Sequence, residues 1–297
     1  MKIAITGSTG LVGKKIIAGL EADGHQVVKL VRGSRNKPDE FLWNPDTEKI
    51  DAKAFEGTDA VIHLEGENIA SKRWTSEQKM KIKKSRVDGT RLIAGTIAAL
   101  ENPPRTLIST SAIGYYGDRG NEFLTEESTS GAGFLAAVCR DWEDATRTAE
   151  SKGLRVVHAR LGVVLSREGG ALKMMLPPFL MGAGGPLGDG KQYMSWIDLD
   201  DAARVFIYLA TKSNLSGPVN VVAPNPETNA QFTKTLARVL HRPAFFPVPT
   251  IGVKVMFGEM GQELLLASNK VSADKLVAAG FQFSYPELES ALKHELN

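Results

Sequence analysis

The sequence lacks several features that would place it in specialised protein classes. Cys139 is the only cysteine in 297 residues, so no disulfide can form within the chain, and we expect a cytoplasmic protein in a reducing compartment. No apolar run reaches the roughly eighteen residues needed for a membrane-spanning helix. The first twenty residues are interrupted by glycines and by two lysines, so we expect no signal peptide.

Charge is also nearly balanced. The formal net charge is +2, and no basic block with interleaved aromatic residues occurs, so we expect neither nucleic acid nor a membrane as a partner. The sequence shows no carboxylate pair and no His/Cys cluster with the spacing of a metal site, so we expect no metal. The chain is long enough for one large α/β domain, or for one domain with an appendage.

The first fourteen residues carry the clearest signal. A short apolar run with β-branched residues, 2–6, predicts a buried strand, and an amphipathic helix is expected from 14 to 21. Between them Gly7, Gly10 and Gly13 form a G-x-x-G-x-x-G turn. Glycines let a backbone turn tightly and approach a pyrophosphate at the start of the helix. The turn therefore predicts a dinucleotide site, with an ordinary βα turn as the alternative.

The end of the second predicted strand, 26–31, indicates which dinucleotide binds. Arg32 stands nineteen residues after Gly13, where an acidic residue usually binds the adenosine ribose, and Arg35 and Lys37 follow. A guanidinium attracts a 2′-phosphate, whereas a carboxylate repels it, so the sequence favours NADP(H). The alternative is a solvated basic loop.

Strands and helices alternate through the first half of the chain. Residues 33–48 are expected to form a loop with a short extended piece, 59–64 a strand, 76–100 a helix and 105–109 a strand. This order predicts an α/β fold with a Rossmann-type, doubly wound parallel sheet. The loops after the first, third and fourth strands should share one crevice.

Hydroxyl groups cluster in the loop that follows the fourth strand. Ser111, Tyr115 and Tyr116 lie in the segment 109–117, and carbonyl or alcohol chemistry needs groups that hydrogen-bond the reacting oxygen and pass a proton. We therefore name these three as candidate catalytic residues. The alternative for Tyr116 is a residue that only shapes the substrate pocket.

Several motifs together resemble a known family. They are the glycine turn, H-L-x-G at 63–66, R-V-x-G-T at 86–90, the S-x-x-x-Y-Y-G loop, C-R-D-W-E at 139–143, and G-F-Q-F at 280–283. With them the chain resembles an extended short-chain dehydrogenase/reductase, and more narrowly the atypical epimerase-like branch of the NAD-dependent epimerase/dehydratase superfamily. Members of that branch carry a short C-terminal domain of unknown function.

The resemblance implies a division of the chain and a set of binding residues. Residues 1–165 and about 190–223 would form the NADP(H)-binding Rossmann domain; about 166–189 and 224–297 would form a smaller substrate-side lobe, with 248–297 a family-specific extension. A homodimer is common in the superfamily. The implied cofactor-binding residues are Gly7, Thr9, Gly10, Leu11, Val12, Gly13, Arg32, Leu64, Glu65, Gly66, Arg86 and Val164, and the implied substrate residues are Met175, Pro177, Gln192 and Trp196.

One departure from the family pattern concerns catalysis. Active members of the wider superfamily carry a Tyr-x-x-x-Lys pair, whose lysine holds a cofactor ribose. If Glu143 occupies the glutamate position of that helix, Leu135 and Cys139 stand where the tyrosine and lysine would be. Leucine has no proton to donate, and a thiol cannot replace an ammonium. Cys139 is either a buried inert thiol or, less in keeping with its neighbours, a nucleophile.

The segment from Met174 to Gly190 has two interpretations. Its methionines, and five glycines between 182 and 190, suggest a flexible lid over an apolar pocket. Equally, the methionines could fill the core and the glycines form a plain loop. Asp198, Asp200 and Asp201 precede a predicted helix and are interpreted as N-cap and first-turn residues.

Two functions follow from these observations. The first is an NADP(H)-dependent oxidoreductase or epimerase-like enzyme, acting on an unidentified small carbonyl or alcohol compound or on a nucleotide sugar. The second is a non-catalytic NADP(H)-binding redox sensor or regulatory module, because the usual catalytic pair is missing.

Overall fold

The structure, a computed structural model, describes residues 1–33 and 37–296, and the chain divides into two compact units. Unit 1 comprises Met1–Ser111, Val138–Arg160 and Ala203–Val219. Unit 2 comprises Ala112–Ala137, Leu161–Ala202 and Asn220–Asn297. The sequence predicted a cofactor-binding domain and a substrate-side lobe. That division is defined by what each part binds, and it stays a prediction.

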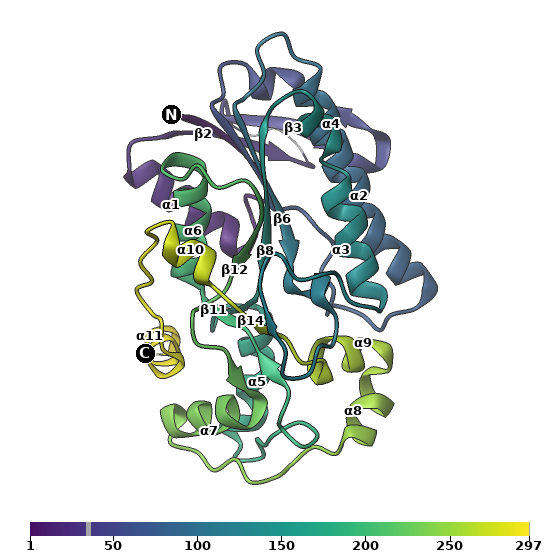
Figure 1. Ribbon diagram of the computed structural model, residues 1–297, viewed down its shortest axis with the longest axis vertical. Helices are drawn as coiled ribbons and strands as arrows, with labels where there is room; N and C mark the ends of the chain where they lie inside the picture. Colours follow the sequence, from purple (N-terminus) through teal and green to yellow (C-terminus); the bar gives the residue numbers. More distant parts are fainter. Residues whose placement is uncertain (34–36, 297) are drawn as a thin grey trace. The chain divides into compact units, whose positions relative to one another are not determined.

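An eight-stranded sheet forms the centre of unit 1, with the strand order β12-β8-β6-β5-β1-β2-β3-β4 (Figure 1). The pairs β1–β2, β1–β5, β5–β6 and β2–β3 are parallel, and β3–β4 is antiparallel. The strands are β1 (Lys2–Thr6), β2 (Gln26–Val31), β3 (Glu40–Asn44), β4 (Lys49–Ile50), β5 (Ala60–His63), β6 (Thr106–Ala112), β8 (Arg155–Leu161) and β12 (Gly217–Val221).

The strand order reverses at β1. From β1 the chain first adds β2 and β3 on one side and then β5, β6, β8 and β12 on the other. This is the topology of a doubly wound sheet, in which ligands bind beyond the carboxyl ends of the strands at the reversal. The predicted fold class is confirmed. The loops after β1, β5 and β6 start at one edge of the sheet, since these strands are parallel neighbours.

Helices cover both faces of this sheet (Figure 1). The helices α1 (Leu11–Ala22) and α6 (Leu199–Thr211) lie on one side, and a Cβ on Gly19 of α1 would lie 2.5 Å from Ile207 of α6. On the other side lie α2 (Ser76–Ala98), α3 (Phe134–Asp144) and α4 (Arg147–Ser151). Apolar side chains of β1, β2, β5 and β6 pack there against those of α2 and α4.

The segment after Arg32 contributes more to the core than the sequence indicated. The expected extended piece is β3, a strand of the main sheet, and two 3₁₀ helices follow at Pro45–Thr47 and Ala52–Phe55. Trp43 of β3 is 1% exposed and packs beside α2, where a Cβ on Gly89 would lie 3.5 Å from its ring. The apolar run 41–43 is only three residues long and lies between polar residues, so its hydrophobic pattern did not indicate this burial.

Unit 2 contains three two-stranded sheets and most of the shorter helices. The strand pairs are β9–β11 and β7–β14, both parallel, and β10–β13, which is antiparallel. The elements are β7 (Phe123–Leu124), β9 (Val163–Leu165), α5 (Gly170–Leu180), β10 (Tyr193–Met194), β11 (Trp196–Asp198), β13 (Glu227–Thr228), α7 (Asn229–Leu240), α8 (Thr250–Phe257), α9 (Glu259–Gly261), β14 (Lys270–Val271), α10 (Asp274–Ala278) and α11 (Leu288–Leu296). Short one-turn elements at Ile113–Tyr116 (3₁₀) and Gln262–Leu266 (π) complete it.

Two apolar clusters hold unit 2 together. The larger gathers side chains of α5, α7 and α11 around Trp196, and the smaller surrounds Tyr116 with Leu124, Val222 and Val271. The helix α7 begins with a capping box, which Thr228 and Gln231 form.

Residues 170–180 form a helix that the sequence did not predict. Pro177 and Pro178 lie inside α5, and proline normally argues against a helix interior because it lacks the N–H donor. The glycine-rich loop that follows runs beside residues 246–248: Gly188 N–H donates to the Val248 carbonyl, and Val248 N–H donates to the Pro186 carbonyl. A Cβ on Gly185 would meet the Phe246 carbonyl oxygen, so glycine permits this close backbone approach.

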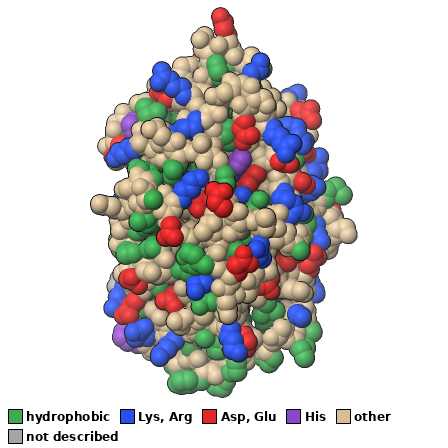
Figure 2. Space-filling model, viewed as in Figure 1, with side chains coloured by type: hydrophobic (Ala, Val, Ile, Leu, Met, Phe, Trp, Pro, Cys, Tyr) green, Lys and Arg blue, Asp and Glu red, His purple; other side chains and the backbone are tan. Residues whose placement is uncertain are grey.

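The surface carries charges of both signs. Lys and Arg side chains are interspersed with Asp and Glu over the face in Figure 2, in keeping with the net charge of +2. None of the helices in the described residues combines the length and apolar composition required to cross a bilayer.

Candidate cofactor and catalytic site

The glycine turn in unit 1 leaves no room for side chains. Gly7 follows β1 with φ of +68°, a left-handed conformation that favours glycine. A Cβ on Gly13 would overlap the Gly7 carbonyl oxygen, and one on Gly10 would lie 3.2 Å from it. The first turn of α1 therefore packs directly on the backbone of the glycine turn.

The N-terminus of α1 has no anionic side chain of its own. Gly10 is the N-cap residue, and the first turn contains no acidic residue. Thr9 is exposed, and Leu11 and Val12 are half-buried. The unpaired N–H groups and the positive end of the helix dipole make such a terminus an anion-binding site.

Arg32 lies directly after β2 and contacts another predicted cofactor residue. Its guanidinium forms an ion pair with Glu65, and the two side chains are 42% and 21% exposed. Arg35 lies outside the described residues. The backbone N–H of Lys37 donates to Glu40. A 2′-phosphate at Arg32 would therefore compete with the Glu65 carboxylate for the same cation.

The turn after β5 is held by a buried hydroxyl. Thr6 Oγ1 accepts the Leu64 N–H at 3.0 Å and lies 2.8 Å from His63 Nδ1. Burial, with a smaller contribution from the charge of Arg32, lowers the pKa of His63 to about 3, so this imidazole is neutral. Thr6 thereby joins the carboxyl ends of β1 and β5. The glycine turn follows β1, and the Leu64–Gly66 turn follows β5.

Arg86 lies on α2 beside this second turn. Its Nη1 donates to the carbonyl oxygens of Glu67 and Ile82 at 3.0 and 3.1 Å. Its guanidinium carbon lies 5.1 Å from the Trp142 ring, and a Cβ on Gly66 would approach that carbon to 3.1 Å. Within the described part of the chain Arg86 forms no salt bridge.

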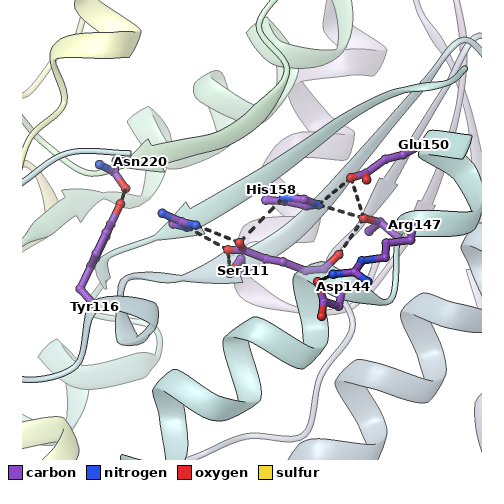
Figure 3. A network of polar contacts seen from close by, with 10 residues as sticks. Ser111, Tyr116, Asp144, Arg147, Glu150, His158 and Asn220 are labelled. Carbon is purple, nitrogen blue, oxygen red and sulfur yellow. Dashed lines mark hydrogen bonds and ion pairs between the residues drawn. The ribbon is translucent and has the colours of Figure 1, made fainter. Parts of the chain in front are cut away.

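Ser111, the first candidate catalytic residue, is buried at the end of β6. Its hydroxyl donates to Glu143 Oε1 at 2.7 Å (Figure 3). The same carboxylate accepts from Arg160 Nε at 2.8 Å and Arg160 Nη2 at 2.9 Å. The resulting buried, bidentate ion pair holds Ser111 in one orientation. Local sequence patterns could not reveal this contact, because Glu143 and Arg160 are distant from Ser111 in sequence.

The network extends from Glu143 towards the surface of unit 1 (Figure 3). His158 Nε2 lies 2.9 Å from Thr146 Oγ1 and 3.4 Å from Glu150 Oε1. The hydrogen bond from His158 is the largest of the effects that lower the pKa of Glu150. A chain of polar contacts therefore connects the buried serine to an exposed carboxylate.

The two tyrosines lie in unit 2 and differ in exposure. Tyr116 is fully buried, and its hydroxyl donates to Asn220 Oδ1 at 2.7 Å (Figure 3). Asn220 is itself held, since its Nδ2 donates to the Ser272 carbonyl. Tyr115 is half-buried, and its ring meets that of Tyr116 edge-on at 5.4 Å. Tyr116 is therefore held by a buried hydrogen bond, and its role, catalytic or structural, stays a prediction.

The helix that would carry the Tyr-x-x-x-Lys pair is α3. Leu135 lies in its first turn and is half-buried, whereas Cys139 is 3% exposed. The backbone N–H groups of Phe134 and Leu135 both donate at 2.8 Å to the carboxylate of Glu263. Glu263 comes from the C-terminal extension, so its capping role was invisible to local sequence signals.

Two known protein families match this chain. Residues 3–223 match the NAD dependent epimerase/dehydratase family. This chain belongs to that family. Residues 248–295 match a domain of unknown function, DUF1731. Both parts of the predicted family resemblance are confirmed.

Relatives of the chain span its whole length. An epimerase family protein of Mycobacterium bovis is 42% identical over 290 residues, which cover 98% of this chain and 96% of the relative. Human SDR39U1, also an epimerase family protein, is 34% identical with 99% of each chain covered. A crystal structure of human SDR39U1 with NADPH superposes with a TM-score of 0.91 at 33% identity, covering 99% of both chains. The NAD complex of UDP-glucose 4-epimerase from Thermus thermophilus reaches 0.74 at 18% identity, a likeness of fold alone.

The predicted substrate residues have unequal surroundings in unit 2. Met175 is half-buried and Pro177 is exposed on α5, and Val164, predicted to meet the cofactor, is half-buried on β9. Gln192 Nε2 donates to two backbone carbonyls at 3.1 and 3.2 Å, and Trp196 is fully buried. The roles of all four predicted substrate residues stay predictions; Trp196 also serves the core.

Unit 2 assembles a charged cluster that no sequence pattern indicated. Ligand-type atoms of Asp198, His294 and Glu295 lie within 4.8 Å of one another. His294 Nδ1 lies 3.0 Å from the Tyr285 hydroxyl, and its Nε2 lies 3.0 Å from Asp200 Oδ2. Asp198 Oδ1 accepts the N–H groups of residues 200 and 201, which confirms its predicted N-cap role for α6.

Proposed function

We propose that this chain binds NADP(H) and acts as a short-chain-type oxidoreductase or epimerase-like enzyme. Its substrate would be an unidentified small carbonyl or alcohol compound, or a nucleotide sugar. The observation that carries the proposal is the turn in which Gly7, Gly10 and Gly13 pack backbone against backbone at the N-terminus of α1, where no side chain caps the helix. A pyrophosphate fits such a turn because backbone N–H groups and the helix dipole replace a charged side chain.

The choice of NADP(H) over NAD(H) rests on Arg32. It lies after β2, where the adenosine ribose is bound in doubly wound folds, and a guanidinium there pairs with a 2′-phosphate. Human SDR39U1, which was crystallised with NADPH, supports this choice through its similarity along the whole chain.

The proton donor for such a reaction would be unconventional. The bound cofactor supplies hydride transfer, and a protein group must exchange a proton with the substrate oxygen. Ser111 already donates to Glu143, and Tyr116 already donates to Asn220. We keep both Tyr115 and Tyr116 as candidate donors, with Ser111 assisting. Normal turnover in Tyr115→Phe and in Tyr116→Phe would contradict this assignment.

Calorimetric titration of cofactor-stripped protein with NADPH, NADP⁺ and NADH tests the binding step. We expect NADH to bind at least about tenfold more weakly than NADPH, a difference of roughly 1.4 kcal/mol. Arg32→Ala should remove this difference. Arg105→Ala, an exposed cation before β6 at the opposite edge of the sheet, serves as the matched control and should keep it.

Two results would contradict the proposal. If none of the three nucleotides binds, the glycine turn is only an element of the fold. If Arg32→Ala keeps the ratio of NADPH to NADH affinity, Arg32 does not contact the 2′-phosphate. A cytoplasmic location and a homodimer also belong to the proposal, and light scattering after gel filtration tests the dimer.

A second function is a non-catalytic redox sensor. Leu135 and Cys139 at the usual tyrosine and lysine positions favour it, as do the engaged hydroxyls of Ser111 and Tyr116. A sensor should bind NADPH and NADP⁺ with clearly different affinities and change its hydrogen-exchange pattern between them. Equal affinities with no such change, or turnover of any carbonyl substrate, would exclude it.

A further inference from the structure

The guanidinium of Arg86 forms no ion pair with a carboxylate of the described residues. It is half-buried on α2, and both of its recorded hydrogen bonds come from Nη1 to backbone carbonyls. Nε and Nη2 therefore have no protein acceptor among the described residues, and no carboxylate lies within ion-pair distance there. Removing a charge from water without pairing it costs free energy, so the site favours an anionic or hydroxyl-rich ligand.

The position of Arg86 relates it to one half of a dinucleotide. In a doubly wound sheet the two halves of the dinucleotide lie on opposite sides of the strand-order reversal. Arg32, after β2, lies on the side that binds the adenosine half. Arg86 touches Gly66 in the turn after β5, on the other side of β1, and therefore faces the nicotinamide half.

Arg86 also adjoins Cys139, which stands at the position of the superfamily's lysine if Glu143 occupies the glutamate position of that helix. Trp142, whose ring lies 5.1 Å from the guanidinium, is three residues after Cys139 on the same face of α3. Burial lowers the pKa of Arg86, and the nearby Cys139 is the first of the groups that oppose this effect. A small side chain at position 139 leaves room for the guanidinium, whereas a lysine there would place a second cation beside it.

We propose that Arg86 binds the ribose hydroxyls of the nicotinamide half of the cofactor and so replaces the cation missing at position 139. This inference rests on the proposed NADP(H)-binding function. The guanidinium approaches from α2 instead of α3. Its Nε and Nη2 groups donate to the ribose, while Nη1 keeps its hydrogen bonds to the carbonyl oxygens of Glu67 and Ile82. In this arrangement the cation at position 86 takes the place of a cation at position 139.

The test compares a complete cofactor with a fragment. NADPH contains the nicotinamide ribose, whereas 2′,5′-ADP contains only the adenosine half. In Arg86→Gln we expect at least about tenfold weaker NADPH binding by calorimetry, with the affinity for 2′,5′-ADP changed less than about twofold. Arg91→Gln, an exposed arginine on the same helix that pairs with Asp88, is the matched control and should match the unsubstituted protein with both ligands.

A second pair of variants separates ribose binding from a structural role. Cys139→Lys should weaken NADPH binding, because its ammonium repels Arg86. The double variant Arg86→Gln/Cys139→Lys should recover most of the lost affinity, since the lysine then supplies the only cation. A merely structural Arg86 would not be rescued in this way.

Each remaining result overturns the inference. Unchanged NADPH affinity in Arg86→Gln, while the unsubstituted protein binds NADPH, refutes it and leaves the proposed function intact. Equal weakening of NADPH and 2′,5′-ADP would assign Arg86 to the adenosine half and also refute it. Failure of the unsubstituted protein to bind either ligand would remove the proposed function and this inference together.

Discussion

Asp198 offers the sharpest test of the energetics of unit 2. Its side chain is fully buried, Oδ1 accepts two backbone N–H groups, and Oδ2 has no hydrogen-bond partner within the described chain. Burial, together with the charge of Glu295, raises the pKa of Asp198 from 3.8 to about 6, against the opposing effect of its backbone hydrogen bonds and of His294. Ionisation of this carboxyl group therefore opposes folding.

The size and sign of the effect follow from linkage. The shift from 3.8 to about 6 corresponds to about 3 kcal/mol at 1.36 kcal/mol for each pH unit. Between these two pH values the native state binds more protons than the unfolded state, so this contribution to stability falls as the pH rises from about 4 to about 6. The full contribution of Asp198 to stability is present below pH 4. Above pH 6 this contribution is lost, and stability no longer changes with pH through this group.

Asp198→Asn should remove this cost. The amide oxygen keeps the two backbone hydrogen bonds, and a neutral NH₂ group replaces the unpaired Oδ2. We expect the free energy of unfolding at pH 7.5 to rise by about 2 to 3 kcal/mol, and the gain over the unsubstituted protein to vanish towards pH 4. Urea denaturation at several pH values between 4 and 7.5 measures both quantities.

A matched control separates the effect of burial from the effect of replacing a carboxyl group by an amide. Asp189→Asn alters an exposed carboxyl group, whose pairing with Lys191 at 3.8 Å is worth little, and should leave stability within about 0.5 kcal/mol. If Asp198→Asn destabilises the protein at pH 7.5, the reasoning is refuted, because the ionised carboxylate would then be a favourable group of the native state.

Three further substitutions test separate parts of the structure. Gly13→Ala should abolish NADPH binding in calorimetry, because its Cβ would overlap the Gly7 carbonyl oxygen. Glu143→Gln should lower the free energy of unfolding in urea by about 3 kcal/mol, because Arg160 then remains buried without its counter-charge. Glu263→Ala should cost about 1 kcal/mol and speed hydrogen exchange in the first turn of α3, which loses its acceptor.

Gly95→Ala is the control for Gly13→Ala, and two outcomes would contradict the reasoning above. A Cβ on Gly95 of α2 would point into open space, so Gly95→Ala should stabilise the helix by up to about 1 kcal/mol. Ordinary NADPH affinity in Gly13→Ala would show that the turn relaxes. A cost below about 1 kcal/mol for Glu143→Gln would show that Arg160 finds other compensation.

Local signals account for what could be predicted. The strand 26–31 was predicted at its observed bounds, and the helix predicted over 76–100 is α2, Ser76–Ala98. Both predictions succeeded because apolar periodicity and helix-end signals act within a few positions of one another. The same local argument failed for α5. Pro177 and Pro178 argue against a helix by propensity, yet packing of Leu172 and Phe179 into the core of unit 2 maintains it.

Residues that are close together along the chain were enough to predict the fold family, the glycine turn and the cation after β2. Three contacts became visible only in the folded chain: Arg32 pairs with Glu65, Glu143 holds Ser111, and Glu263 caps α3. These contacts join segments up to 129 residues apart, and nothing in periodicity or spacing encodes them. They arise because buried charges and helix ends must find partners wherever the packed chain brings them.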